Sequence, residues 1–119
     1  MGHVRTAIRI AHPERRDEAA EILDALVDIG ASFTTLPRAL AQQLGLASLG
    51  QLSGRTAAGV QTLDQSYAYI EMAGKRSVTP VLISDTLDMV LIGVLTLESL
   101  ALAVDPATGQ LKESEVLLL

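Results

Sequence analysis

The sequence has no cysteine and no tryptophan, and its 119 residues include only one phenylalanine, two tyrosines and two histidines. Without cysteine there can be no disulfide, thiolate zinc site, iron–sulfur cluster or cysteine nucleophile. With so few aromatic rings, the core must be aliphatic, and stacking on bases or sugars has little material to use. Two histidines against 14 acidic residues favour carboxylates over imidazoles for any catalysis.

Long apolar runs are also missing. The longest uncharged apolar stretch near the C-terminus covers residues 89–97, which is nine residues, whereas a membrane span needs about 20. Near the N-terminus, Arg5 and Arg9 interrupt the apolar residues, so no signal-peptide core is predicted. A net charge of −5 and a pI near 4.8 argue against nucleic acid and anionic membranes as partners. We therefore expect a cytoplasmic protein.

What the sequence does contain is aliphatic residues. Hydrophobic residues make up 49% of the chain and the mean hydropathy is +0.35, which excludes disorder. The length suits a single domain over residues 1–119 with one core of its own. A small domain this apolar is also expected to bury part of its surface in a partner or in a second copy.

The hydrophobic pattern predicts a mainly β domain with two short helices. Residues 3–10 alternate between apolar and polar side chains, which is typical of a half-buried strand. Pro37 and Gly45 bracket a short helix over residues 37–44, and a second helix is predicted over residues 94–100. Further strands are predicted over residues 21–27, 33–36, 49–73 (two runs flanking a tip at 56–59), 77–83, 89–92, 101–104 and 110–112.

One group of neighbouring residues, around Asp28, is a candidate catalytic site. The apolar pair Leu26–Val27 leads directly into Asp28, followed by Gly30 in a predicted turn. A carboxylate at the end of an apolar strand is costly unless turn N–H groups compensate it. From these residues alone two interpretations stay open: Asp28 satisfies a tight turn, or it faces its own copy across a two-fold axis.

Residues 25–37, ALVDIGASFTTLP, closely resemble the active-site segment of retropepsin-like aspartic proteases, a family with bacterial members. The family motif is two apolar residues, then Asp-Thr/Ser-Gly-Ala/Ser, then a strand. Its second landmark, two apolar residues and a glycine before a short helix, resembles Leu91, Ile92 and Gly93. A flap hairpin lies between the landmarks in the family, where this chain has residues 55–64. The resemblance spans residues 4–111.

The resemblance implies an all-β, retropepsin-like acid-protease barrel with one lobe per chain, one or two short helices and a flap hairpin. It implies a homodimer that hydrolyses extended peptides through a water activated by paired Asp28 carboxylates, which share one proton because two such groups about 3 Å apart cannot both ionise. It requires no metal and no cofactor. The implied active-site loop is Ile29, Gly30, Ala31 and Ser32, and the implied substrate-binding flap is Ala57, Ala58, Gly59 and Val60.

Ile29 departs from the family pattern, which has threonine or serine there. In the family that hydroxyl bonds across the dimer axis and braces the two aspartate loops, whereas isoleucine can neither donate nor accept. Both residue types are β-branched, so the backbone need not change. This departure bears on activity more than on fold. The alternative function is therefore a catalytically inert retropepsin-fold module that dimerises or binds peptides.

Other groups offer weaker chemistry. The two histidines, His3 and His12, have no carboxylate pattern of metal-ligand spacing around them. Ser32 lacks an evident base nearby in sequence. We expect Asp85 and Asp88 in a turn, with calcium binding as an open alternative, and Tyr67 and Tyr69 on the sheet surface. The tail, residues 116–119, suits either the core or an intersubunit strand.

Overall fold

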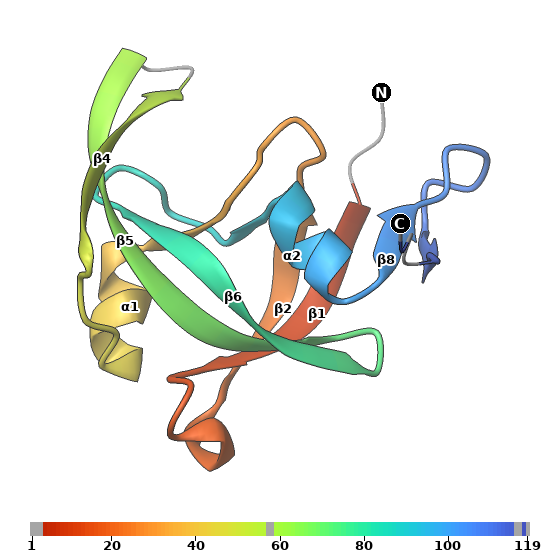
Figure 1. The fold of residues 1–119 in the computed structure, drawn as a ribbon, viewed down its shortest axis with the longest axis horizontal. Coiled ribbons are helices and arrows are strands. Elements are labelled where there is room, and N and C mark those ends of the chain that lie inside the picture. Colours follow the sequence, from red (N-terminus) through yellow and green to blue (C-terminus); the bar gives the residue numbers. More distant parts are fainter. Residues whose placement is uncertain (1–3, 57–58, 116–117, 119) are drawn as a thin grey trace.

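The computed structural model describes residues 4–56, 59–115 and 118. It contains nine strands, two α-helices and one 3₁₀ helix, η1 (Figure 1). In chain order the elements are β1 (Val4–Ala11), η1 (Arg16–Glu18), β2 (Ala20–Val27), β3 (Thr34–Pro37), α1 (Arg38–Leu44), β4 (Gly50–Thr56), β5 (Gly59–Met72), β6 (Lys75–Ser84), β7 (Leu91–Ile92), α2 (Val94–Ser99), β8 (Leu102–Val104) and β9 (Leu111–Glu113).

Six strands close into a barrel. The main sheet runs β1-β2-β7-β3-β6-β5-β4, and an additional β1–β5 pairing joins its first and sixth strands. Closure removes the exposed edges that an open sheet would present. β4 lies outside the closed circuit and pairs only with β5, as the first strand of a long hairpin. Figure 1 shows this hairpin (yellow-green) extending away from the barrel.

The core is aliphatic, as the sparse aromatic content predicts. Alternation along β1 directs Ile8 and Ile10 inward, with exposed fractions of 3% and 0%. The largest fully buried apolar side chains come from five different strands, so they fill the barrel interior: Ile10, Leu36, Ile70, Met72, Val81, Ile83 and Ile92. The predicted all-β barrel with two short helices is thus confirmed.

Both helices end and pack as expected from their sequences. Gly45 terminates α1 with a left-handed φ of 72°, and its N–H donates to the carbonyl of Gln42. In and just after α2, Leu97 and Leu100 are 4% and 3% exposed. Pro80 lies in β6, one residue before the pairing of β6 with β3 begins at Val81. The N–H that proline lacks is therefore not needed for the β3–β6 ladder.

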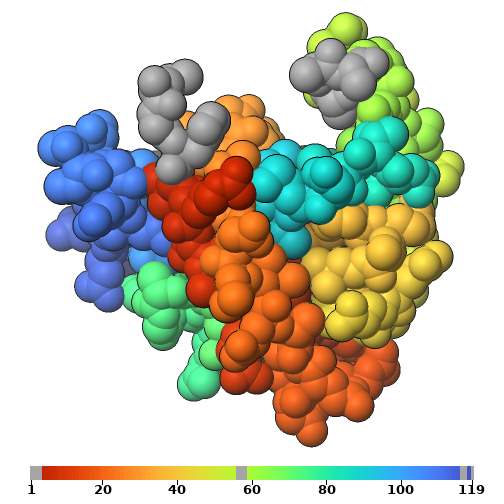
Figure 2. Space-filling view, turned by 180° about the vertical axis from the view of Figure 1, so that it is seen from behind, coloured from red at the N-terminus to blue at the C-terminus, as the bar shows by residue number. Residues whose placement is uncertain are grey.

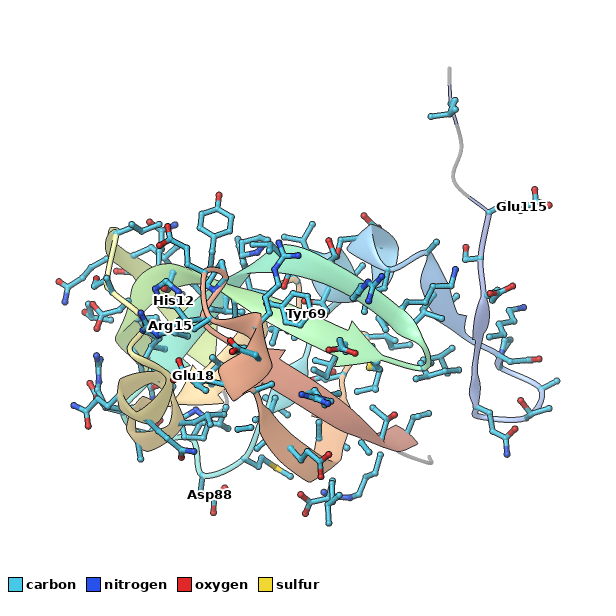
Figure 3. All side chains as sticks on the ribbon, turned by 90° about the horizontal axis from the view of Figure 1, so that it is seen from below. His12, Arg15, Glu18, Tyr69, Asp88 and Glu115 are labelled. Atoms are coloured by element: carbon cyan, nitrogen blue, oxygen red, sulfur yellow. The ribbon has the colours of Figure 1, made fainter. Side chains whose placement is uncertain are left out.

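One local expectation differs from the structure, on the face of β5 next to η1. Tyr69, expected on the surface, is only 5% exposed, and the guanidinium of Arg16 lies 5.0 Å from its ring centroid (Figure 3). The charged segment that carries η1 therefore covers this face of β5, and burial raises the pKa of Tyr69. Tyr67 is half exposed, as expected.

The C-terminal tail falls mostly outside the described residues. Val116, Leu117 and Leu119 are not among them, while Leu118 is 89% exposed and so is not core. Before the tail, β9 is tied to the barrel by an ion pair of 3.5 Å between Glu113 and Lys75. In the part of the chain that the structure describes, no helix is long and apolar enough to cross a membrane.

Candidate active site

The end of β2 delivers Asp28 into a tight turn. Its main-chain N–H donates to the carbonyl of Ile92 at 2.9 Å, and its carbonyl accepts from Ala31 N–H at 3.1 Å. Its side-chain Oδ1 accepts from Gly30 N–H at 2.9 Å. The residue is half-buried. The carboxylate is therefore held by its own turn while remaining open to solvent on one side.

The second apolar–glycine segment lies directly beneath this turn. Val94 N–H donates to the carbonyl of Ala31, and Leu95 N–H donates to the carbonyl of Ser32, both at 2.9 Å. A Cβ on Gly93 would lie 2.4 Å from the carbonyl carbon of Phe33, so only glycine fits this approach. The two landmarks identified in the sequence are thus one structural unit.

A buried cluster of three threonine hydroxyls supports that unit from below. Thr34 Oγ1 lies 2.6 Å from Thr96 Oγ1 and accepts from Gly93 N–H at 3.0 Å, while Thr79 Oγ1 lies 3.1 Å from Thr96 Oγ1. All three side chains are fully buried. They join β3, β6 and α2 under the turn that carries Asp28. Nothing in the sequence marked these threonines, because they lie far apart in the chain and form no pattern.

A cleft of about 880 Å³ opens beside Asp28. Figure 2 shows a hollow between the β4–β5 hairpin and the loop after β2. Its lining is mainly apolar and small polar, and Asp28 and Arg55 are the charged residues among those that line it. The lining residues are Asp28, Gly30, Ala31, Ser32, Phe33, Thr35, Leu52, Ser53, Gly54, Arg55, Gln61, Leu63, Leu82, Ser84, Thr86, Leu87 and Leu91.

The structure brings most of the predicted site residues together. Gly30, Ala31, Ser32 and Leu91 line the cleft with Asp28. Ile92 and Gly93 lie buried behind it. The side chain of Ile29 points elsewhere: the residue is 67% exposed and does not line the cleft.

The predicted flap is described only in part. Ala57 and Ala58 lie outside the described residues. Gly59 begins β5 with a φ of +110°, and Val60 is 64% exposed. Among the described hairpin residues, those that line the cleft come from both strands, three inside the predicted 55–64 hairpin and three just before it: Leu52, Ser53, Gly54, Arg55, Gln61 and Leu63.

Arg38, at the start of α1, is a second feature that sequence reasoning missed. It forms ion pairs with Asp64 of β5 and with Asp85 just after β6. These hydrogen bonds lower the pKa of Asp64 and raise that of Arg38. Asp85 thus lies in the expected turn region but serves as an arginine partner. The signal for Asp64 was its isolation, since it is the only charged residue between positions 56 and 70.

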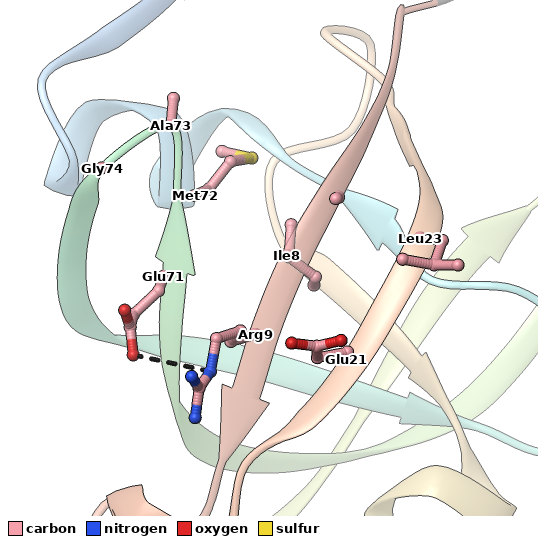
Figure 4. Close-up of a pocket in the computed structure, with 9 residues that line it drawn as sticks. Ile8, Arg9, Glu21, Leu23, Glu71, Met72, Ala73 and Gly74 are labelled. Atoms are coloured by element: carbon pink, nitrogen blue, oxygen red, sulfur yellow. Dashed lines mark ion pairs between the residues drawn. The ribbon is translucent and has the colours of Figure 1, made fainter.

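Two other hollows share no residue with this cleft. One of about 310 Å³ lies beside the Arg9–Glu71 ion pair of 4.0 Å, with Glu21 and Leu23 on its wall (Figure 4). Another of about 320 Å³ lies where Arg15 donates to the carbonyl of Leu44.

Metal-binding groups are not gathered anywhere in the described part of the chain. Among residues 4–56, 59–115 and 118, no three His, Cys, Asp or Glu side chains lie close enough to hold a metal ion. His12 instead accepts a hydrogen bond on Nδ1 from Glu14 N–H at 3.0 Å. His3 lies outside the described residues.

A closed barrel of this topology, with an aspartate turn lying on a second apolar–glycine segment, is the retropepsin-like aspartic protease fold. A family model described as aspartyl protease matches residues 20–96. The chain belongs to this aspartyl protease family. No curated protein matches the sequence.

Solved structures agree on the fold. EIAV protease complexed with the inhibitor HBY-793 superposes with a TM-score of 0.61 at 17% identity, over 98% of this chain and 94% of that one. Simian foamy virus (mac) protease superposes with a TM-score of 0.58 at 19% identity, over 80% of this chain and 92% of that one. A retropepsin-like aspartic protease from Rickettsia conorii superposes with a TM-score of 0.56 at 22% identity, over 82% of this chain and 70% of that one.

Proposed function

We propose that this chain, as a single domain over residues 1–119, is a homodimeric aspartic endopeptidase in which Asp28 of each copy supplies one catalytic carboxylate. The observation that carries the proposal is the half-buried carboxylate of Asp28 beside a cleft of about 880 Å³, on a turn anchored to Ile92 at 2.9 Å. The family match supports an aspartic protease activity. The cleft is large enough for a peptide segment.

The chemistry follows from pairing two such carboxylates. At a separation of about 3 Å both cannot be ionised, so the pair holds one proton. The ionised Asp28 accepts a proton from a water molecule, which attacks the peptide carbonyl carbon. The protonated Asp28 donates to the carbonyl oxygen, giving a tetrahedral intermediate that collapses as the leaving nitrogen is protonated. Neither a metal nor a cofactor is needed.

Dimerisation completes the site, because each chain contributes one Asp28. Apolar side chains are exposed beside the turn, at 67% for Ile29 and 37% for Leu95, and Leu118 is 89% exposed. Burying them against a second copy removes apolar surface from water. The hairpin then covers the substrate, which pairs with it as an added strand. A mainly apolar cleft lining favours extended peptides with aliphatic side chains.

A peptide-library digest across mildly acidic to neutral pH tests the enzyme. Cleavage by the parent that disappears in Asp28→Asn supports the proposal, and cleavage that survives the substitution overturns it. Light scattering coupled to size exclusion tests the dimer, with an expected mass of twice 12.6 kDa. A persistent monomer at micromolar concentration contradicts it.

Ile29 favours a second candidate, an inert module with the same fold. Its exposed side chain has no hydroxyl with which to brace the paired turns. In that case the cleft binds extended peptides without cutting them. Binding of a peptide by both the parent and Asp28→Asn, with no cleavage by either, supports this alternative.

A further inference from the structure

Arg38 joins two carboxylates that belong to different parts of the barrel. Its Nη1 lies 2.6 Å from Asp64 Oδ2, its Nε lies 2.7 Å from Asp85 Oδ1, and its Nη2 lies 3.4 Å from Asp85 Oδ2. The Asp64 side chain is only 10% exposed, against 66% for Asp85. A planar guanidinium can make all these bonds at once, whereas an ammonium cannot match two separated acceptors in the same geometry.

Asp64 lies at the base of the hairpin. Its Oδ1 also accepts from Ser48 Oγ at 3.2 Å and from Gln51 Nε2 at 3.1 Å. Gln51 is its cross-strand partner in the β4–β5 pairing. The carboxylate therefore ties β4, β5 and the segment before β4 to Arg38, the first residue of α1. The rest of the β4–β5 hairpin extends from this base along the cleft.

Asp85 belongs to the segment after the neighbouring strand, since β6 pairs with β5 and places Ile83 opposite Asp64. It follows β6 directly, and its neighbours Ser84 and Thr86 line the cleft. Thr86 Oγ1 also donates to Gln61 Oε1 of the hairpin at 3.0 Å. Arg38 itself does not line the cleft. One guanidinium thus joins the base of the hairpin to the segment after β6 from outside the cleft that both segments line.

We propose that Arg38 is a positioning residue, which fixes the hairpin relative to the wall formed by residues 84–87 and so sets the width of the cleft. This inference rests on the proposed function for its effect on catalysis. A substrate that pairs with the hairpin requires that hairpin at a fixed distance from Asp28. Misplacement by about 1 Å can cost a hundredfold in rate, and partial loosening is expected to cost about tenfold in kcat/KM.

The test compares Arg38→Met and Arg38→Lys with Arg76→Met. Arg76 is an exposed arginine on β6 with no ion pair among the described residues, which makes it a matched control. Amide hydrogen exchange is measured in residues 50–56 and 59–65, with β8 and β9 as the internal reference. This readout works whether or not the protein cleaves peptides.

Arg38→Met is expected to accelerate exchange in the hairpin by at least about tenfold over the reference strands and to lower kcat/KM about tenfold. Arg38→Lys keeps one ion pair and is expected to fall between Arg38→Met and the parent. Exchange that rises equally in the hairpin and the reference strands indicates a purely structural role and overturns the inference. So does exchange unchanged from the Arg76→Met control.

Should Arg38→Met fail to fold, Asp85→Asn decides instead. It alters only the exposed partner and leaves Asp64 paired, so it is expected to raise exchange in the hairpin by a smaller factor. No change in the hairpin contradicts the inference. If the parent cleaves no peptide, the proposed function fails separately, while the exchange measurements still decide the role of Arg38.

Discussion

The N–H of Asp28 donates a 2.9 Å hydrogen bond to the carbonyl of Ile92. This bond joins the end of β2 to the end of β7, two strands that run parallel at Leu26–Leu91 and Val27–Ile92. The candidate acid is therefore held by β7, a segment more than 60 residues further along the chain. Its position depends on how tightly the two segments pack.

Gly93→Ala tests that packing. The new Cβ would lie 2.4 Å and 2.5 Å from the main-chain carbon and oxygen of Phe33, which cannot move aside as a side chain would. We expect the free energy of unfolding to fall by about 3 kcal/mol. Gly30→Ala is the control, because its Cβ meets only the Asp28 side chain, at 3.2 Å. Urea unfolding that shows equal losses for the two variants contradicts this account.

Thr96→Val tests the hydroxyl cluster. Valine keeps the shape but removes the shared partner of Thr34 and Thr79, at 2.6 Å and 3.1 Å. Leaving these buried hydroxyls short of a partner is expected to cost about 1–3 kcal/mol of unfolding free energy. Thr62→Val, at an exposed site on β5, is expected to stay within about 0.5 kcal/mol of the parent. A silent Thr96→Val would show that the cluster adds nothing to stability.

Ile29→Thr tests the departure from the family motif. A hydroxyl that bonds across the dimer axis contributes about 0.5–1.5 kcal/mol, which corresponds to a rate gain of about two- to tenfold if it is expressed in the transition state. Ile29→Val is the matched control, since it is β-branched without a hydroxyl. Peptide cleavage by Ile29→Thr no faster than by Ile29→Val would mean that the missing hydroxyl does not limit activity.

Acid titration tests the Arg38–Asp64 pair. Hydrogen bonds from Arg38 and Gln51 hold the pKa of Asp64 below its usual value, which is about 3.9 in an unfolded chain. The pair therefore contributes its full stability above that pH and loses it as the pH falls through the lowered pKa of the folded state. We expect the stability difference between the parent and Asp64→Asn to be constant at neutral pH and to shrink only in strong acid. A difference that already shrinks near neutral pH contradicts the lowered pKa.

Local rules predicted the mainly β domain and its short helices, and the family resemblance predicted the barrel. Alternation in β1, the glycine stop after α1 and the turn signals around the hairpin each depend on neighbouring residues, so they could be identified without the fold. The motif around Asp28 and the segment from Leu91 to Gly93 could be recognised for the same reason. That Asp28 is catalytic stays a prediction.

Long-range partners could not be predicted. Asp64 stands alone among uncharged residues, which indicates a need for a partner, but Arg38 and Arg55 were equally available in sequence. Tyr69 seemed to face solvent because alternation ignores what covers a strand, and here the segment with η1 covers it. The same limit applies to Thr34, Thr79 and Thr96, whose hydroxyls meet only after three elements pack.

The order and spacing of apolar residues, glycines and one aspartate were enough to predict a mainly β domain with an aliphatic core and a turn bearing a carboxylate, because backbone and burial preferences act over a few residues. The closed barrel was expected from the family resemblance. Tertiary structure alone decided which arginine binds Asp64, how Gly93 meets Phe33 and where the cleft opens. These contacts join residues far apart in the chain, and their geometry exists only once the barrel has closed.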